Sequence, residues 1–210
     1  MKGLETRVVP VALRAAEPED SQVLLSADAA VFNQRSEDLG GFIETIEPGF
    51  FRNVLNGDTV ALFQHDEAFV LGRTTATPPT LSLEETPTVL RSLITVADNA
   101  RNREWVIDPI GRGEIRHMSF AFRVGPDGDQ WGELEDGRLL RTLKAGGCSS
   151  LGDVSPVTRP AYPGTDVSAA KRSLDRWLGT QRSTHGADDI PLSLLRLRAR
   201  LVQTQLSCRE

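Results

Sequence analysis

The alternation of apolar and polar residues along the chain predicts a mainly β protein. Alternating segments, and runs of β-branched and aromatic residues bounded by glycine, proline or aspartate, are typical of strands. The segments that fit are residues 21–33, 41–47, 59–72, 80–85 and 118–124, then a hairpin over 131–147 and an extended, proline-rich segment over 150–165. Short helices are predicted over residues 48–57 and about 95–110, and Pro109 must end or distort the second one.

The end of the chain has a different pattern. Segments 168–180 and 188–206 are helical in composition, with a polar linker between them. The second segment carries an apolar stripe at helical spacing, formed by Ile190, Leu194, Leu197 and Leu201. We therefore place a boundary near Thr165 and expect three parts. They are an N-terminal arm (1–20), a body (21–165) and a helical C-terminal tail (166–210).

Charge separates the tail from the body. From residue 169 onward the chain has eight Lys/Arg and four Asp/Glu, a balance of +4, which leaves −9 for the rest of a chain of net charge −5. A basic tail on an acidic body is typical of a segment that docks on an acidic partner, and a solvated helix surface has the same composition. The acidic body lacks the basic surface that phosphate contacts require, so we expect no nucleic-acid partner.

Other classes are excluded by missing patterns. No window approaches the roughly 18 consecutive apolar residues of a membrane span, and the first 20 residues lack the apolar region of a secretory signal. Cys148 and Cys208 are far apart and stand in no metal-binding spacing, so we expect no disulfide framework, no metal and a cytoplasmic location. No P-loop or dinucleotide-binding motif is present, and we expect no organic cofactor and no membrane partner.

Three histidines limit where imidazole chemistry can occur. His117 directly precedes a predicted strand and is expected to be a partly exposed turn residue, while His185 lies in the polar linker. His65 lies within the predicted strand 59–72, directly before an acidic pair, and is the candidate general base. A surface histidine at the end of a strand would fit the same pattern.

A candidate nucleophile lies in the alternating segment 118–124. Its core face would carry Met118, Phe120, Phe122 and Val124, and its other face Ser119, Ala121 and Arg123. A nucleophilic serine needs a rigid, accessible position and a histidine within about 3 Å, and Ser119 beside a small alanine suits that need. A strand serine that merely faces solvent has the same pattern, and no GxSxG motif is present.

Asp153 is the candidate third member, because a serine mechanism needs an acid that orients the histidine. It is expected at the head of a strand that two prolines terminate. An aspartate that caps a turn through its own backbone fits equally well. Cys148 lies in a Gly/Ser-rich segment and is expected to be a loop residue.

Six motifs, in this order, resemble the prohead protease family of tailed bacteriophages. They are AAVFN, SEDLGGF, EPGFF, HD followed by VLGRT, MSFAF and DVSPVTRPAYPGT, and they run from about Leu25 to Thr165. Members of this family resemble the herpesvirus assemblins in fold. The resemblance therefore implies an α+β, mainly β fold, with a closed or nearly closed β-barrel surrounded by helices and a C-terminal helical extension.

The resemblance also implies an activity and its residues. Such proteins are serine endopeptidases that cut scaffold sequence from the major capsid protein, and often cut themselves, inside the assembling prohead in the host cytoplasm. Carried onto this chain, the histidine of the HD motif is His65, the serine of MSF is Ser119 and the acid before VS is Asp153. Relatives commonly have an aromatic residue before PAYP, where this chain has Arg159. An arginine there is expected either to lie near the oxyanion, as one does in the assemblins, or to be a solvated or paired side chain.

By the same analogy we expect a homodimer, with the capsid protein and scaffold as substrates. The alternative is a protein of the same fold that acts as a non-catalytic internal scaffold, with the tail helices driving association. The joint presence of His65, Ser119 and Asp153 favours the protease.

Overall fold

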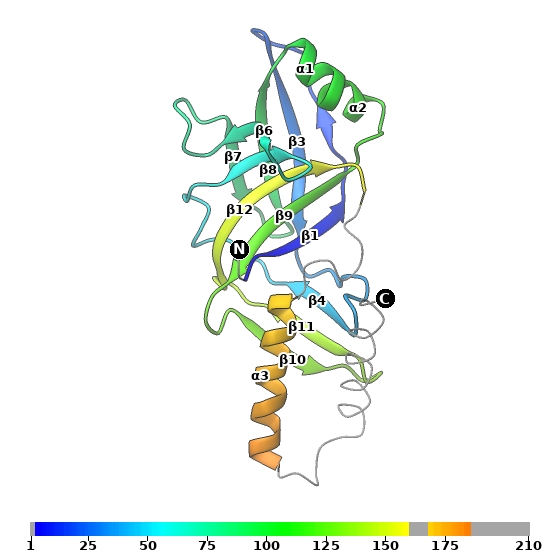
Figure 1. Cartoon of the computed structure of the whole chain (residues 1–210), viewed down its shortest axis with the longest axis vertical. Helices are drawn as coiled ribbons and strands as arrows, with labels where there is room; N and C mark the ends of the chain where they lie inside the picture. The colour runs from blue at the N-terminus through cyan, green and yellow to red at the C-terminus, as the bar shows by residue number, and fades with distance from the viewer. Residues whose placement is uncertain (1–2, 160–167, 186–210) are drawn as a thin grey trace.

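The computed structural model describes residues 3–159 and 168–185, and within them the protein is mainly β (Figure 1). The strands are β1 (Glu5–Pro10), β2 (Arg14–Ala15), β3 (Gln22–Val31), β4 (Phe42–Ile46), β5 (Val60–Phe63), β6 (Asp66–Arg73), β7 (Leu81–Glu85), β8 (Val89–Ala97), β9 (His117–Val124), β10 (Asp129–Glu133), β11 (Leu139–Leu143) and β12 (Cys148–Val157). The helices are α1 (Ala100–Asn102), the π-helical η1 (Arg103–Ile107), α2 (Asp108–Gly111) and α3 (Ser168–His185).

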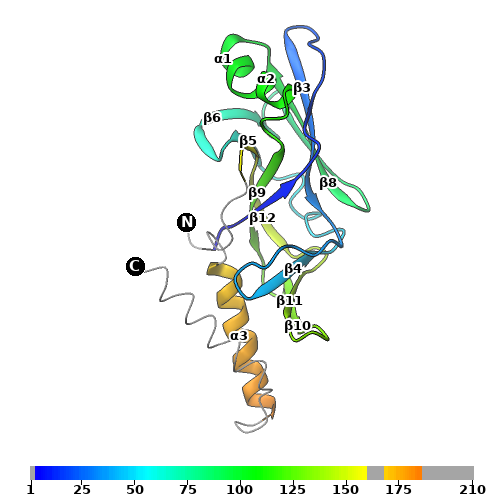
Figure 2. The same ribbon diagram turned by 90° about the vertical axis from the view of Figure 1, so that its right-hand side faces the viewer.

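The strands form three sheets, of order β1-β9-β12-β5-β6, β2-β3-β8-β7 and β10-β11-β4. Neighbouring strands are antiparallel except for β12 with β5 and β11 with β4, which are parallel. In Figure 1 the helical segment α1–α2 lies at the upper end of the molecule, and the three-stranded sheet lies with α3 at the lower end. Figure 2 shows the four-stranded sheet beside the five-stranded one.

The closed or nearly closed barrel implied by the resemblance is not found among the described residues, where each sheet remains open. The ends of β6 and β7 do meet. Thr80 donates its backbone N–H to the Arg73 carbonyl at 3.1 Å, and the Arg73 N–H donates to Thr80 Oγ1 at 3.0 Å. Gly72 permits this approach, since a Cβ there would lie 2.6 Å from the Thr80 carbonyl oxygen. Beyond this junction β6 continues its ladder with β5 and β7 with β8, so the two sheets do not merge.

The helix predicted over residues 48–57 is wrong. The segment is a run of turns, in which the Arg52 N–H bonds to the Gly49 carbonyl and the Val54 N–H bonds to the Phe51 carbonyl. Gly49 has φ +86°, a conformation that an α-helix does not contain. In this run of turns the adjacent Phe50 and Phe51 are both fully buried in the core.

The helix predicted over about 95–110 starts later than expected. β8 continues to Ala97, and the helix begins after Asn99, whose side chain accepts from the Asn102 N–H at 2.9 Å. The distortion predicted at Pro109 takes the form of the π-helical turn η1 directly before it. Proline has no N–H to give to the preceding turn, and a widened turn reduces the clash of its ring with that turn.

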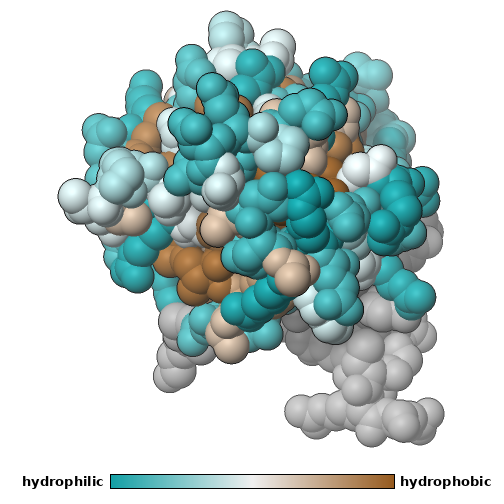
Figure 3. All heavy atoms as spheres, turned by 90° about the horizontal axis from the view of Figure 1, so that it is seen from above, coloured by the Kyte–Doolittle hydropathy of each residue, from teal (hydrophilic) through white to brown (hydrophobic). Residues whose placement is uncertain are grey.

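The main core lies between the five-stranded and four-stranded sheets. Its aromatic centre is a set of edge-to-face contacts among Phe50, Phe51, Phe120 and Phe122. From above, the surface is mostly hydrophilic with smaller apolar patches (Figure 3). No helix in the described part of the chain is long and apolar enough to cross a membrane.

The predicted first tail helix is present as α3, and it runs through His185, so most of the expected linker is helical. Ala170 and Leu174 of α3 are buried against Phe42, Trp131 and Leu139 of the three-stranded sheet, in a second, smaller core. The predicted second tail helix, its apolar stripe and the boundary near residue 165 lie outside the described residues.

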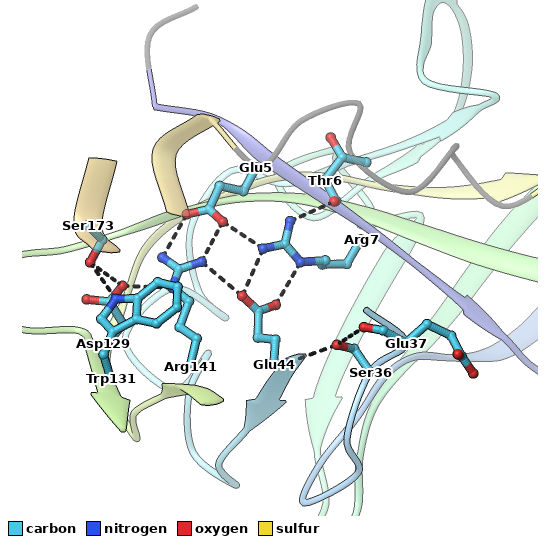
Figure 4. Close-up of polar contacts among 10 residues, drawn as sticks. All are labelled: Glu5, Thr6, Arg7, Ser36, Glu37, Glu44, Asp129, Trp131, Arg141 and Ser173. Carbon is cyan, nitrogen blue, oxygen red and sulfur yellow. Dashed lines mark hydrogen bonds and ion pairs between the residues drawn. The ribbon is translucent and has the colours of Figure 1, made fainter. Parts of the chain in front are cut away.

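A buried group of charged side chains lies where the five-stranded sheet meets the three-stranded one (Figure 4). We call it the charge cluster, and it consists of Glu5, Arg7, Glu44, Asp129 and Arg141. Arg7 donates to Glu44 at 2.7 and 2.8 Å and to Glu5 at 2.8 Å. Arg141 donates to Glu5 at 2.6 and 3.0 Å, to Glu44 at 2.9 Å and to Asp129 at 2.7 Å.

The charge cluster ties α3 to the sheets. Asp129 Oδ2 accepts from Ser173 Oγ at 2.7 Å, and Trp131 Nε1 donates to Ser173 Oγ at 3.0 Å. Burial alone would raise the pKa of the Glu44 carboxyl, but the charges and hydrogen bonds of Arg7 and Arg141 outweigh it and hold that pKa below its usual value. The Glu44 carboxylate therefore remains charged while buried.

Candidate active site

His65 lies in a two-residue turn between β5 and β6, and its prediction within a strand is wrong. Gln64 and His65 have φ of 57° and 60°, and the two strands pair up to the turn, as in a type I′ hairpin. Histidine is among the residues found more often than most in this left-handed region. The turn is fastened to β12, because Gln64 donates its N–H to the Pro156 carbonyl at 3.2 Å and its Nε2 to Thr158 Oγ1 at 3.1 Å. His65 is thus held over β12.

The alternation predicted for residues 118–124 is confirmed in β9. Met118, Phe120 and Phe122 are fully buried in the main core, and Ser119 lies on the opposite face. Ser119 differs from the expectation in one respect, because it has no exposed surface (0 %). β9 is an inner strand, with Val8 of β1 and Ser155 of β12 directly opposite Ser119 on either side, and the His65 ring lies over the hydroxyl at 2.6 Å.

Asp153 lies in the middle of β12, not at the head of a strand. Leu151 pairs with Phe122 and Asp153 pairs with Ala121, so Gly152 is an extra residue, a β-bulge. Successive strand side chains point to opposite faces, so one extra residue moves every later side chain to the other face. Without the bulge, Asp153 would lie on the core side of the sheet rather than on the face of Ser119.

The three side chains meet on that face, and we call them the Ser–His–Asp group. His65 Nδ1 is 2.6 Å from Asp153 Oδ1, and His65 Nε2 is 2.6 Å from Ser119 Oγ. A carboxylate only accepts, so Nδ1 carries the imidazole proton and Nε2 is left as an acceptor for the serine hydroxyl. The arrangement matches the geometry of a nucleophile, a base and an orienting acid.

The Ser119 hydroxyl has a second acceptor within reach. The backbone carbonyl of Arg7 on β1 lies 3.1 Å from Oγ, farther than His65 Nε2. A hydroxyl has one proton, and the shorter distance favours its donation to the histidine. His65 is also the most exposed member of the group, at 31 %, against 13 % for the Asp153 side chain.

Sequence reasoning did not single out Ser155, which lies in the same group of contacts. Its Oγ donates to Asp153 Oδ1 at 2.7 Å and lies 3.3 Å from His65 Nδ1. The signal that was available is its spacing, because residues two apart on a strand share a face and Ser155 follows Asp153 by two.

Arg159 follows the end of β12 and its side chain is exposed. Thr158, the residue before it, accepts a hydrogen bond through Oγ1 from Gln64 Nε2 of the His65 turn at 3.1 Å. The oxyanion role of Arg159 remains a prediction. His117 begins β9, and burial together with the charge of Arg116 lowers its pKa.

Cys148 begins β12 and is buried, so its prediction as a loop residue is wrong. Burial raises the pKa of its thiol to about 12, which disfavours the reactive thiolate. In the described part of the chain, no three or more His, Cys, Asp or Glu side chains are grouped so as to hold a metal ion.

The chain was compared with models of protein families. A family model described as Caudovirus prohead serine protease matches residues 10–179 of the chain, which include β2 to β12 and most of α3. Comparisons with curated proteins and with solved structures gave no significant match.

Proposed function

The chain belongs to the Caudovirus prohead serine protease family and is thus a serine protease of prohead maturation, and we propose that Ser119, His65 and Asp153 perform its chemistry. The observation that carries this proposal is the chain of two 2.6 Å contacts from Ser119 Oγ through His65 to Asp153. Nucleophile, base and orienting acid stand in the order that peptide acyl transfer requires.

In the proposed reaction Ser119 Oγ attacks the scissile carbonyl carbon while His65 Nε2 takes the hydroxyl proton. Asp153 holds the Nδ1–H and stabilises the imidazolium that forms. The carbon–nitrogen bond then breaks, and His65 gives its proton to the leaving amine, which leaves an acyl group on Ser119. Water then attacks the acyl carbon while His65 takes one of its protons. The bond between the acyl carbon and Ser119 Oγ breaks, and His65 returns the proton to Oγ.

Two features of this site bear on the substrate. Because Ser119 has no exposed surface, a peptide carbonyl can reach Oγ only when the groups covering it move. We propose Arg159 as a cation for the developing oxyanion, supported by its place beside the residue that binds the His65 turn. An oxyanion is stabilised most by charge aimed at it before the reaction begins.

We propose that the substrates are the major capsid protein and its scaffold sequence, and that the protease also cleaves itself, in the assembling prohead in the host cytoplasm. The family supports this choice of substrates. A homodimer and docking of the basic tail 166–210 on an acidic scaffold or capsid surface are proposed with it, the latter from the +4 charge balance of residues 169–210.

The test is intact mass over time for purified wild type, Ser119→Ala and Ser149→Ala, each alone and with the major capsid protein encoded alongside it. Ser149 is a matched control, because it lies on β12 and donates to the Arg123 carbonyl at 3.2 Å. We expect new fragments with wild type and Ser149→Ala and none with Ser119→Ala. A folded Ser119→Ala protein that still cleaves contradicts the nucleophile assignment. Unchanged masses in all three, with capsid protein co-eluting, favour the non-catalytic scaffold.

A further inference from the structure

The proposed mechanism assigns no role to the buried hydroxyl of Ser155. Ser155 has no exposed surface (0 %), yet its Oγ touches both Asp153 and His65, at 2.7 and 3.3 Å. A buried hydroxyl needs an acceptor, and a nearby main-chain carbonyl normally supplies one. Here the acceptor is the carboxylate of the proposed third member.

The backbone fixes this hydroxyl in place. Ser155 pairs directly with Ser119 across the β12–β9 ladder, so the two serines share the site face. The bulge at Gly152 brings Asp153 and Ser155 to that face together, because both lie beyond it on the same strand. Pro156, which comes next, restricts φ and accepts the Gln64 N–H that anchors the His65 turn.

The direction of the hydrogen bonds defines what Ser155 can do. Asp153 Oδ1 accepts two of them, one from His65 Nδ1–H and one from Ser155 Oγ–H. The oxygen of Ser155 then turns a lone pair toward the same Nδ1–H. The hydroxyl thus restrains rotation of the carboxylate and contacts the imidazole at the same nitrogen.

We propose that Ser155 is a positioning residue of this protease, which holds the Asp153 carboxylate in the orientation that keeps the His65 proton on Nδ1. The proposal rests on the proposed roles of Ser119, His65 and Asp153. Ser155 acts through Asp153 and does not touch the substrate, so its loss changes the rate of the chemical step and leaves peptide binding unaltered.

The experiment compares Ser155→Ala with wild type on a peptide that spans the first cleavage site mapped by intact mass. We expect kcat to fall about tenfold with KM within about twofold, since part of the general-base contribution depends on orientation. Ser155→Thr, which keeps a hydroxyl on the same Cβ, should recover most of the lost rate. Ser92→Ala is the matched control, because Ser92 is equally buried and donates to the Ala27 carbonyl on β3. It should leave kcat unchanged.

A double-mutant comparison tests the route through Asp153. If Ser155 acts by orienting that carboxylate, Ser155→Ala should cost nothing further in an Asp153→Asn protein. Proton NMR gives a readout independent of turnover, because the short Nδ1–H···Oδ1 bond should give a low-field imidazole signal that Ser155→Ala weakens or shifts. If Ser155→Ala fails to fold, Ser155→Cys, which fills the space but donates weakly, serves for the same measurements.

The outcomes separate this inference from the proposed function. A folded Ser119→Ala protein that still cleaves overturns the proposed function, and the Ser155 assignment falls with it. In a second outcome Ser119→Ala is inactive, while Ser155→Ala (or Ser155→Cys) keeps the wild-type kcat and the wild-type imidazole signal. That result overturns the Ser155 assignment alone. A loss that appears only in KM, or that adds fully to Asp153→Asn, also overturns it.

Discussion

The Ser–His–Asp group and the charge cluster are two polar networks of very different exposure, and both involve β1. The first, taken with Ser155, has one carboxylate, one imidazole and two hydroxyls, and its histidine is 31 % exposed. The second has three carboxylates and two guanidiniums, with Arg141 only 1 % exposed. An imidazole can exchange a proton with substrate near neutral pH, whereas a guanidinium cannot. The network with the partly exposed imidazole can therefore do chemistry, whereas the charge cluster has a structural role.

Arg7 joins the two networks. Its guanidinium lies between Glu5 and Glu44 in the charge cluster, while its carbonyl oxygen lies 3.1 Å from Ser119 Oγ. The charge cluster thus holds the side chain of the same β1 residue whose carbonyl contacts the Ser119 hydroxyl. Changes in one network should alter activity with little effect on stability, and changes in the other should do the reverse.

The largest effect is expected from breaking the Ser–His–Asp group at Asp153. Asp153→Asn presents an N–H to His65 Nδ1, which favours the tautomer with its proton on Nε2, where it cannot accept from Ser119. We expect kcat to fall by about 10⁴ with an unfolding midpoint close to wild type. Peptide-cleavage kinetics and urea unfolding measure the two. Asp66→Asn is the control, an acid next to His65 whose Oδ1 accepts from the Ala68 N–H; equal losses in both variants would contradict the assignment.

The strand pattern predicted which faces of β9 meet the core, because hydrophobic burial acts on every second residue of a strand. It could not place Ser119 on an inner strand, since burial of the other face depends on which strands pair with β9. The Gln64–His65 turn was missed because neither residue is a usual turn former. A continuous strand of 14 residues would nevertheless have been unusually long.

The bulge at Gly152 and the charge cluster also could not be predicted from the pattern of residues. Gly152 adds one residue to β12 without a signal that distinguishes it from any other strand glycine. Glu5, Arg7, Glu44 and Arg141 are charged residues of the kind that strands usually expose, and only their ion pairs across β1, β4 and β11 permit their burial. Local preference fixed most strands, whereas contacts between distant segments determined the site.

The next largest effect is expected from breaking the charge cluster at Arg141. Among the described residues, Arg141→Met leaves Glu5 and Glu44 with Arg7 as their one guanidinium partner and leaves Asp129 without an ion pair. Buried negative charge is then no longer balanced, which costs about 3–5 kcal/mol of unfolding free energy. Urea unfolding measures the loss. Arg91→Met is the control, since the Arg91–Asp28 pair on β8 and β3 is exposed, and such pairs contribute at most about 1 kcal/mol. Equal destabilisation by the two variants would show that the cluster is not what holds β1 and β11 together.

A smaller effect is expected from acid. The pKa of Glu44 is lowered in the folded protein, so its stabilisation is fully present above the ordinary value of 4.5 and is lost as pH falls below it. Urea unfolding between pH 7 and pH 3.5 should show a stability that declines below about 4.5, by less than the Arg141→Met loss. Glu44→Gln, although less stable at pH 7, should show a flatter decline. Glu84 is an exposed strand residue, and the stability of Glu84→Gln should decline with falling pH as that of wild type does. If the stability of Glu44→Gln declines just as steeply, the acid sensitivity comes from other groups.

The smallest effect is expected at Cys148, a buried group with a titratable proton but no charged partner to ionise it. Burial raises the pKa of its thiol to about 12, so at pH 8 almost none of it is the reactive thiolate. Iodoacetamide at pH 8 should leave Cys148 unmodified in the folded protein, and should modify it in urea, as followed by peptide mass. Cleavage activity should survive the treatment. Rapid modification of Cys148 with loss of activity would mean that burial on β12 does not exclude nucleophilic chemistry. A buried thiol on β12 would then ionise without exposure and without an oppositely charged neighbour. Exposure and charge pairing would no longer explain why the Ser–His–Asp group is reactive and the charge cluster is not.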